Sequence, residues 1–428
     1  MSARIPASME QRDIWLALQH EGESGRYNVP LFLDFQGTVD TAALEFALAD
    51  VTARHEALRS RFELTGGELR QVVDSPSAVQ LTVHPSAVSQ GRDAAFAASV
   101  RAAARPMNPS ARKMLRADLF PYSGGQILCL VTHHIVADRW SLEVIARHIV
   151  RAYGRRLEGQ VADLGTTPSS IDVPADHSGH DVGIRYWNEQ LAGDWRWLVP
   201  ASDLAPGNSP DTVPASHEVV MPASAVKLLR VQLEQRGLSP VSAVMAGWAL
   251  LLHAWSGFAD GLIGMPFSGR NMPSTHDEVG LFTRVLPIRT QFAPEVSFSE
   301  FAESVRDRVL TSLEFSEIPV DTLRSLRNAT GENPFAPEVV LTPYTRVVDL
   351  GKVGEAVVEL LEDPADLADY RLALVVREDA GQIALRLDYD SMTYRTGTAQ
   401  LLLRQLSDRK STRLNSSHKT VSRMPSSA

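Results

Sequence analysis

The stretch that decides the fold reads ILCLVTHHIVADRWSLEVI and occupies residues 127–145. Its first six residues are apolar or β-branched and predict a short buried strand. From Ser141 onward apolar residues recur at helical spacing, and we place the N-cap of this helix at Ser141. His133, His134 and Asp138 therefore lie at a strand-to-helix junction, close to the partial positive charge of a helix start. A histidine on such a turn can face a cleft and handle protons.

Two other interpretations of the adjacent histidines remain open at this point. The pair could be satisfied polar groups at the rim of a core. A metal site is disfavoured because neighbouring strand residues point to opposite faces, so His133 and His134 cannot easily chelate one ion together. The chain also has no HExxH or CxxC pattern. We expect one histidine to face a site and the other to brace the turn.

Composition agrees with a soluble globular protein. The 428 residues are 44% hydrophobic and 22% charged, enough for one large core or two smaller ones. No apolar stretch approaches the ~20 residues of a membrane span, and the N-terminus has no signal-peptide layout. The single cysteine, Cys129, excludes an internal disulfide framework and indicates the cytoplasm. It lies within the apolar strand, where a small buried side chain is expected rather than a nucleophile. The net charge of -9 argues against nucleic acid as a partner.

The chain divides into two mixed helix-and-strand regions. We expect an N-terminal lobe over residues 1–170, a linker at 171–180 that ends a stretch rich in Asp, Thr, Pro, Ser and Gly, and a C-terminal lobe over 181–408. The second region is predicted to contain an apolar helix at 241–255 and strands at 339–341 and 385–389.

Residues 409–428 look foreign to the rest of the chain. They contain five Lys and Arg residues and no acid, and they resemble translated sequencing-adapter readthrough. We expect a non-native, disordered tail, with a genuine basic tail as the alternative. The change in character falls inside a helical pattern at 401–406 that should close the domain.

Motifs along most of the chain resemble those of the condensation-domain family of nonribosomal peptide synthetases. The opening element Ser-x-x-Gln-x-x-x-Trp matches residues 8–15, and Arg-His-Glu-x-Leu-Arg-x-x-Phe matches residues 54–62. Further matches follow in the family's order, from about residue 5 to about residue 405. They are Tyr27-Asn28-Val29-Pro30, Tyr186-Trp187 with Leu191, Gly264-x-Pro266 with Gly269-Arg270, Val279-Gly280-Leu281-Phe282, Leu286-Pro287-x-Arg289, Ile318-Pro319-Val320-Asp321, Asn333-Pro334-Phe335 and Tyr389.

The resemblance implies an α/β fold with mixed sheets, built as two chloramphenicol-acetyltransferase-like lobes in a V with the active site between them. It implies an acyltransferase of antibiotic and other secondary-metabolite biosynthesis, which joins a carrier-bound acyl or peptidyl thioester to an amine. The partners would be donor and acceptor peptidyl carrier proteins, with adenylation domains as further candidates, and not nucleic acid or membrane. No cofactor or metal would be bound, because substrates arrive on phosphopantetheine arms. We expect a cytoplasmic monomer.

The resemblance also assigns roles to individual residues. His134 is the catalytic group, either as a base toward the amine or mainly as a positioning group. His133 braces the turn. Asp138 could polarise His134, but a structural role is preferred, and Arg59 is its expected ion-pair partner. The ordinary alternative is that Arg59 is a solvated helix residue. Removing either member of a buried pair should be costly.

Two positions depart from the family pattern. Arg139 follows the aspartate where the family usually has glycine, and Arg284 stands where it usually has asparagine. Glycine would allow an unusual backbone conformation, whereas arginine adds bulk and a permanent charge. We treat Arg139 and Arg284, with Trp140 and Ser141, as substrate-channel candidates. The extra cations suggest an acidic substrate or a centre that no longer forms peptide bonds.

Three other functions therefore stay open. The chain could be a non-catalytic domain that docks carrier proteins or recruits a tailoring enzyme, an ester-forming condensation enzyme, or an epimerase of the same superfamily. The intact His134 argues against the recruiting class. The Met1 start, just ahead of the first motif, leads us to expect a free-standing enzyme or the first domain of a synthetase.

Overall fold

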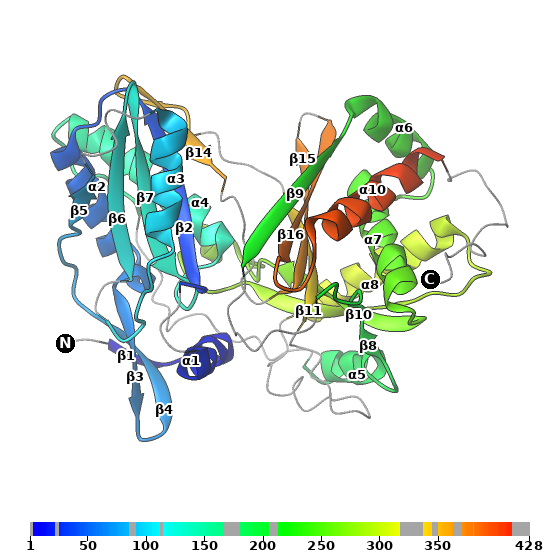
Figure 1. The fold of residues 1–428 in the computed structure, drawn as a ribbon. Coiled ribbons are helices and arrows are strands. Elements are labelled where there is room, and N and C mark those ends of the chain that lie inside the picture. The colour runs from blue at the N-terminus through cyan, green and yellow to red at the C-terminus, as the bar shows by residue number, and fades with distance from the viewer. Residues whose placement is uncertain are drawn as a thin grey trace. The chain divides into compact units, whose positions relative to one another are not determined.

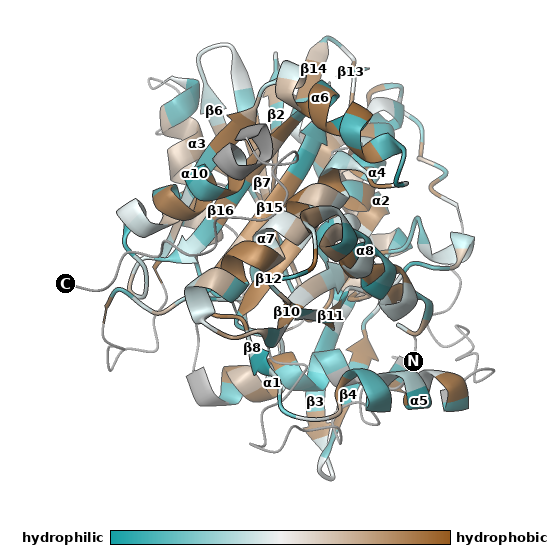
Figure 2. Ribbon diagram, turned by 90° about the vertical axis from the view of Figure 1, so that its right-hand side faces the viewer, coloured by the Kyte–Doolittle hydropathy of each residue, from teal (hydrophilic) through white to brown (hydrophobic). Residues whose placement is uncertain are grey.

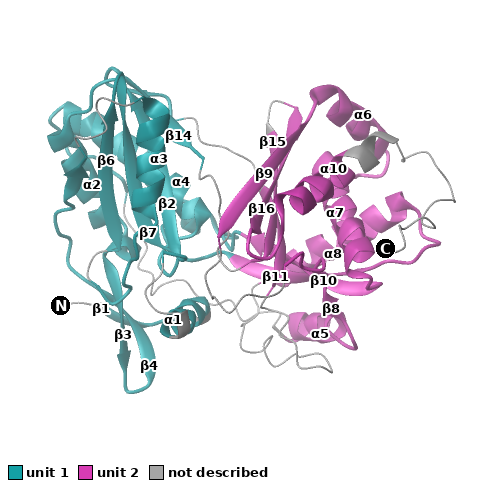
Figure 3. Ribbon diagram, in the orientation of Figure 1, with its two compact units in different colours: residues 1–176, 268–283, 347–364 teal, residues 177–267, 284–346, 365–428 magenta. Residues whose placement is uncertain are grey.

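The computed structural model forms two compact units, drawn in different colours in Figure 3. Unit 1 contains residues 1–176, 268–283 and 347–364, and unit 2 contains residues 177–267, 284–346 and 365–428. Two segments from the second half of the sequence therefore belong to unit 1. The structure describes residues 3–21, 25–84, 91–111, 114–165, 180–204, 213–316, 337–344, 350–362, 370–379 and 381–412.

Unit 1 is built on a six-stranded sheet with the strand order β13-β14-β2-β7-β6-β5. β7 is central, antiparallel to both β2 and β6. The strands span β2 (Asn28–Gln36), β5 (Leu81–Val83), β6 (Leu115–Tyr122), β7 (Gly125–His133), β13 (Lys352–Val353) and β14 (Ala356–Leu361). A separate three-stranded sheet has the order β1-β4-β3. Its strands are β1 (Ala3–Pro6), β3 (Ser60–Thr65) and β4 (Glu68–Val73).

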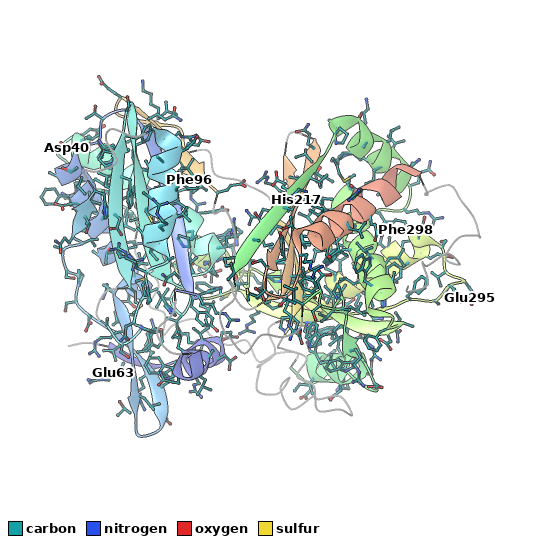
Figure 4. All side chains as sticks on the ribbon, viewed as in Figure 1. Asp40, Glu63, Phe96, His217, Glu295 and Phe298 are labelled. Carbon is teal, nitrogen blue, oxygen red and sulfur yellow. The ribbon has the colours of Figure 1, made fainter. Side chains whose placement is uncertain are left out.

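Helices cover both faces of the six-stranded sheet (Figure 1). α2 (Thr41–Arg54) and α4 (Arg139–Leu157) pack on one face, and α3 (Arg92–Ala103) packs on the other. β7 serves both cores, because alternate side chains of a strand point to opposite faces. Its Leu128 and Leu130 join the α2/α4 core, whereas Cys129 and Val131 join the α3 core. On the α3 side, Phe96, labelled in Figure 4, meets Phe32 edge-on, with ring centroids 5.2 Å apart.

Three further elements belong to unit 1. They are α1 (Met9–Glu21), the 3-10 turn η1 (Glu56–Arg59) and the 3-10 turn η3 (Pro273–Thr275). The β3–β4 hairpin, which carries Glu63, extends away from the six-stranded sheet (Figure 4). β1 pairs with β4 and holds the chain that leads into α1 against this hairpin.

Unit 2 has one seven-stranded sheet, in which β8 pairs with β10 beside the main path β11-β10-β12-β15-β16-β9. Its strands are β8 (Arg196–Trp197), β9 (Pro214–Met221), β10 (Asp260–Phe267), β11 (Arg284–Gln291), β12 (Val339–Tyr344), β15 (Leu372–Asp379) and β16 (Gln382–Asp390). Its helices are α5 (His180–Gln190), α6 (Ala223–Glu234), α7 (Pro240–Ser256), α8 (Phe298–Glu314) and α10 (Thr396–Thr412).

The core of unit 2 lies around α7, whose apolar residues and those of β15 appear brown in Figure 2. α7 has clear start and stop signals. Ser239 accepts the backbone N–H of Ser242, Pro240 occupies the first turn, and Gly257 ends the helix with a φ of 77°. Only glycine adopts this left-handed conformation readily, so it is a natural helix stop. The predicted helix at 241–255 and strands at 339–341 and 385–389 are confirmed as α7, β12 and β16.

The strand-to-helix prediction at residues 127–145 is confirmed, with one correction. The N-cap of α4 is Asp138 and not Ser141: the Asp138 side chain accepts the backbone N–H of Ser141, which lies inside the first turn. Aspartate is as good an N-cap as serine, and the helix begins earlier than its apolar spacing indicates because Arg139 and Trp140 form its first turn.

Several expectations concern residues outside the described ranges. They include the motif matches at 318–321 and 333–335, all but the last residue of the expected linker at 171–180, and positions 413–428 of the expected tail. α10 runs through residues 409–412. Among the described residues, none of the helices has the length and hydropathy that crossing a membrane requires.

Candidate active site

The candidate site is the loop that joins β7 to α4 in unit 1. His134 begins this loop, and its backbone N–H donates to the carbonyl of Tyr27 at 2.8 Å. Its side chain is half-buried, and Nδ1 lies 2.9 Å from the carbonyl oxygen of Ala137. A carbonyl can only accept, so Nδ1 must be the protonated nitrogen. In the neutral ring Nε2 therefore carries the lone pair, which is what a hydrogen-bond acceptor or base needs.

His133 is the last residue of β7 and is fully buried. Its Nδ1 accepts the backbone N–H of Ile135 at 3.1 Å, so the side chain bonds to the loop that follows it. Burial, with a smaller contribution from His134, lowers the pKa of His133 to about 3. The His133 ring is therefore neutral at physiological pH and adds no charge beside His134.

Asp138 is also fully buried and accepts several hydrogen bonds. Oδ1 accepts the backbone N–H of Ser141 at 2.8 Å and lies 2.7 Å from the Ser141 hydroxyl oxygen. Oδ2 accepts the backbone N–H groups of Phe282 at 3.0 Å and of Thr283 at 3.1 Å. Its ion-pair partner is Arg270, with Nη2 3.0 Å from Oδ1.

The expected pairing of Asp138 with Arg59 is wrong. Arg59 lies on η1, where Nη1 donates to the carbonyl of Asp74 at 2.6 Å and Nη2 donates to Glu56 at 3.3 Å. Of these partners, Glu56 lies on η1 and Asp74 directly follows β4. The His134 ring bonds to the carbonyl of Ala137, and Asp138 bonds to Ser141, Arg270, Phe282 and Thr283. This arrangement favours the structural role for Asp138.

Arg270 is the buried cation that the sequence interpretation did not assign. Its side chain is 1% exposed. Besides Asp138, it donates to the carbonyl of Glu278 at 2.8 Å and to the Ser141 hydroxyl at 2.9 Å, and its guanidinium lies 4.2 Å from the centre of the Phe282 ring. Burial lowers the pKa of Arg270, and the negative charge of Asp138 opposes that shift. In the sequence, the motif match at Gly269-Arg270 was the signal that could have identified this residue.

Arg270 belongs to segment 268–283, which returns from the second half of the sequence to unit 1. Gly269 has a φ of +61°, and a Cβ there would lie 2.1 Å from the carbonyl oxygen of Phe282, so this turn requires glycine. Farther along, Glu278 forms a two-bond ion pair with Arg54 at 3.1 and 2.7 Å, and both side chains are largely buried. These contacts attach the segment to α2 as well as to α4.

Another histidine pair lies close by: His55 is the C-cap residue of α2, and His148 is on α4. His55 Nε2 and His148 Nδ1 are 2.9 Å apart, and the rings are stacked. Burial, with a smaller contribution from His148, lowers the pKa of His55 to about 2. Burial and the nearby charge of Arg54 lower the pKa of His148 to about 4. His148 has no motif signal in the sequence.

The remaining predicted site residues have different surroundings. Arg139 is the half-buried first residue of α4. It has helical backbone geometry, which any L residue adopts, so this position does not need the glycine usual in the family. The Trp140 ring donates to the carbonyl of His276 at 2.9 Å. Ser141 is buried and accepts the backbone N–H of Gly280 at 3.1 Å. Arg284 lies in unit 2 at the start of β11, where it donates to the carbonyl of Ser316 at 3.1 Å.

Chemically, the loop presents one histidine nitrogen able to accept a hydrogen bond, on a backbone held by buried polar contacts. Cys129 is buried within β7, as expected. Across the ranges that the structure describes, no three His, Cys, Asp or Glu side chains gather as a metal site. Proton acceptance or hydrogen-bond orientation by His134 is therefore the chemistry that the described residues support best.

Comparisons with known proteins agree with these motifs. The family model for the condensation domain matches residues 1–424. The chain is 31% identical over 336 residues to the isonitrile lipopeptide synthase of Mycobacterium tuberculosis, a match that covers 75% of this chain and 13% of that protein. It is 28% identical over 424 residues to the phosphinothricin tripeptide synthetase PhsC of Streptomyces viridochromogenes, covering 93% of this chain and 38% of that protein. The chain thus spans well under half the length of these relatives.

Solved structures show the same fold. The X-domain from teicoplanin biosynthesis aligns with a TM-score of 0.82 at 22% identity, covering 96% of this chain and 95% of that one. The first condensation domain of the CDA synthetase aligns with a TM-score of 0.76 at 18% identity, covering 96% and 97%. The expected α/β fold with mixed sheets, of the chloramphenicol-acetyltransferase type, is confirmed.

Proposed function

This chain belongs to the condensation-domain family, and from that premise we propose that it is a condensation enzyme of nonribosomal peptide synthesis. It joins an acyl or peptidyl group, held as a thioester on one carrier protein, to the amine of an acceptor on a second carrier protein. The synthetases among its relatives support this pathway. The observation that carries the proposal is the orientation of His134, whose Nδ1–H donates to Ala137 and leaves Nε2 as the acceptor.

The proposed reaction is an aminolysis of a thioester. The neutral amine attacks the thioester carbonyl, the new C–N bond forms, and the C–S bond breaks. The amine must lose one proton as the amide forms, and the departing thiolate must gain one. His134 Nε2 orients the amine and accepts its proton, which then passes to the sulfur. Holding the reactants in place and moving this proton are the two contributions that the residue can make.

The surrounding residues fix the histidine rather than react. His133 braces the loop through its bond to Ile135. Asp138 and Arg270 join the start of α4 to segment 268–283. In this proposal Arg139, with Trp140 and Arg284, contributes to the substrate path. The expected channel role of Ser141 is replaced by a structural one, because Ser141 is fully buried. A permanent cation at Arg139 favours an acceptor that carries a carboxylate or another anion.

Partners and setting follow from the same reaction. Both substrates arrive on phosphopantetheine arms of donor and acceptor carrier proteins, with adenylation domains supplying the activated amino acids. The chain itself works without a bound cofactor or metal, as a monomer in the cytoplasm, and its product is a peptide-type secondary metabolite such as an antibiotic.

A non-catalytic role is the second candidate. Arg139 and Arg284 both replace uncharged residues usual in the family, and the chain shares its fold with the X-domain from teicoplanin biosynthesis. In that case the chain would bind carrier proteins or a tailoring enzyme without forming a bond. Ester formation with a hydroxyl acceptor and epimerisation are further alternatives that product analysis separates.

Two substitutions of His134 test the proposal. Donor and acceptor loaded on carrier proteins are mixed with the enzyme, and the carriers are analysed by intact mass. His134→Ala should abolish amide product. His134→Gln should retain an oxygen that orients the amine but cannot take its proton, and we expect a rate about 100- to 10,000-fold below wild type if proton transfer dominates.

The matched control is His217→Ala, because His217 is a half-exposed histidine on β9 of unit 2 (Figure 4) and should leave turnover unchanged. Wild-type turnover in His134→Ala contradicts the assignment of His134. Binding of loaded carriers without any product from the wild-type chain supports the non-catalytic candidate instead. A product mass or chirality that indicates an ester or an epimer assigns the corresponding alternative.

A further inference from the structure

The loop that carries His134 is bonded to side chains from the N-terminal motif. Gln11, in the first turn of α1, donates from Nε2 to the carbonyl of Ile135 at 3.1 Å. Ile135 is fully buried and Gln11 is 9% exposed. This bond joins residues 124 positions apart in the sequence. It holds the peptide group that joins Ile135 to Val136, one residue beyond His134.

The amide of Gln11 has only one consistent orientation. Its Oε1 accepts the backbone N–H of Ser8 at 2.9 Å, which fixes Nε2 as the donor end. Nε2 then donates both to Ile135 and to Oε1 of Gln71, 3.2 Å away. In turn Gln71 Nε2 donates to the hydroxyl of Ser60 at 2.8 Å.

The chain of hydrogen bonds ends on the second N-terminal motif. The Ser60 hydroxyl accepts from Gln71 and donates to the carbonyl of Glu56 at 2.8 Å. Each donor in the series thus bonds to an acceptor. The orientation of the Gln11 amide fixes that of the Gln71 amide. The series connects η1 and the β3–β4 hairpin, through Gln11, to the catalytic loop. We call the side chains of Gln11, Gln71 and Ser60 the amide relay.

Gln11 also helps to cap the start of α1, and this role is distinct from the amide relay. Ser8 Oγ accepts the backbone N–H of Gln11 at 3.2 Å, while Gln11 Oε1 accepts the backbone N–H of Ser8. This reciprocal pair is a capping box that stabilises the start of α1. Of the Gln11 side chain, the capping box uses only Oε1, whereas the amide relay uses only Nε2.

We propose that Gln11, through the amide relay, is a positioning residue for His134. This inference rests on the proposed function for its kinetic consequence. The backbone of Ile135 is bonded at both ends: its N–H, in the peptide group that follows His134, donates to His133, and its carbonyl, in the next peptide group, accepts from Gln11. Because the His134 ring bonds to Ala137 within the same loop, a shift of the Ile135 backbone changes where His134 Nε2 points.

The test uses the fact that Oε1 of Gln11 serves the capping box and Nε2 serves the amide relay. Gln11→Glu retains an oxygen for the capping box but loses the donor to Ile135. Ser8→Ala removes the hydroxyl half of the capping box and leaves the relay intact. Gln11→Ala removes both functions of the Gln11 side chain. A positioning role therefore groups Gln11→Glu with Gln11→Ala, whereas a purely helix-capping role groups Ser8→Ala with Gln11→Ala.

Steady-state kinetics with carrier-bound substrates give the first measurement. We expect Gln11→Glu and Gln11→Ala to lower kcat about 10- to 100-fold with KM nearly unchanged, as for a small displacement of a catalytic group. Ser8→Ala should retain wild-type kcat. A wild-type kcat in Gln11→Glu together with a low kcat in Ser8→Ala overturns the proposal. If Gln11→Ala does not fold, Gln71→Met removes the relay at a half-buried position and should lower kcat less than Gln11→Glu does.

A second measurement does not depend on turnover. In protein labelled with ¹⁵N-histidine, NMR identifies the ring signals of His134 by their loss in His134→Gln. We expect the Nδ1–H signal to weaken or shift in Gln11→Glu and to stay unchanged in Ser8→Ala. Unchanged His134 signals in all Gln11 variants overturn the positioning role. If wild-type protein forms no product, the proposed function fails, and these spectra still decide whether the relay positions His134.

Discussion

Replacing Arg270 by alanine should destabilise unit 1, and the size of the effect follows from what Asp138 retains. Arg270 and Asp138 are 1% and 0% exposed, and their charged atoms are 3.0 Å apart. Removing one partner of a buried pair typically costs about 3–5 kcal/mol. In Arg270→Ala, Asp138 still accepts backbone N–H groups from Ser141, Phe282 and Thr283. We therefore expect a loss near the lower end, about 3 kcal/mol.

The reverse substitution should cost more. Asp138→Ala leaves the Arg270 guanidinium buried among carbonyl oxygens of Thr275 and Glu278, without its counterion. It also removes the N-cap of α4, which adds about 1 kcal/mol. The backbone N–H groups of Phe282 and Thr283 lose their acceptor as well. We expect about 5 kcal/mol or more, and the double variant should lose clearly less than the sum of the two single losses.

Arg59→Ala is the matched control, because Arg59 is the arginine that the family motif suggested. Its ion-pair partner Glu56 is 31% exposed, so this pair is weak. With the bond to Asp74 included, we expect about 1–2 kcal/mol and no coupling to Asp138→Ala. Urea denaturation of the single and double variants gives the free energies. Hydrogen exchange of α4 and segment 268–283 shows where stability is lost without assuming two-state unfolding. Additive losses for Arg270 and Asp138, or coupling between Arg59 and Asp138, would refute the assigned pair.

Two further results are expected. The pKa values of His55, His148 and His133 are lowered to about 2, 4 and 3 by burial, so below pH ~6.5 the unfolded chain binds more protons than the folded one. The free energy of unfolding should therefore fall as the pH drops from about 6.5 toward 4, by up to about 1.4 kcal/mol per pH unit for each proton. Denaturation at several pH values should show a weaker dependence of this free energy on pH in His148→Gln than in wild type. An equal dependence in the two proteins contradicts the argument. Arg139→Gly should broaden acceptor use toward neutral amines, and a competition between acidic and neutral acceptors that gives identical product ratios for both proteins contradicts a side-chain role in specificity.

The local elements could be predicted because their signals lie within a few residues. β7 follows from a short apolar run, and α7 from the apolar helical stretch at 241–255. The start of α4 was misplaced by three residues because both Asp138 and Ser141 are good N-caps. What decided between them is the set of bonds that Asp138 makes to residues far along the chain. A local pattern contains no information about those bonds.

The sequence could not predict which residues far apart in the chain bond to one another. Arg59 and Arg270 both lie in family motifs, and both have the charge that Asp138 needs. The choice depends on segment 268–283 returning to unit 1, which places Arg270 within 3.0 Å of a residue 132 positions earlier. The bond from Gln11 to Ile135 is of the same kind. Its two ends lie in motifs that were matched separately, without any indication that they touch.

These contacts have a common physical cause. The loop that carries His134 leaves a central strand and turns into a helix, while Ile135, Val136 and Ala137 are fully buried. Buried peptide groups need partners, and a five-residue loop cannot pair all of them internally. Tyr27 accepts the N–H of His134, and Gln11 donates to the carbonyl of Ile135. The position of His134 therefore depends on distant segments that are bonded to its loop, and substitutions in those segments should move the His134 ring.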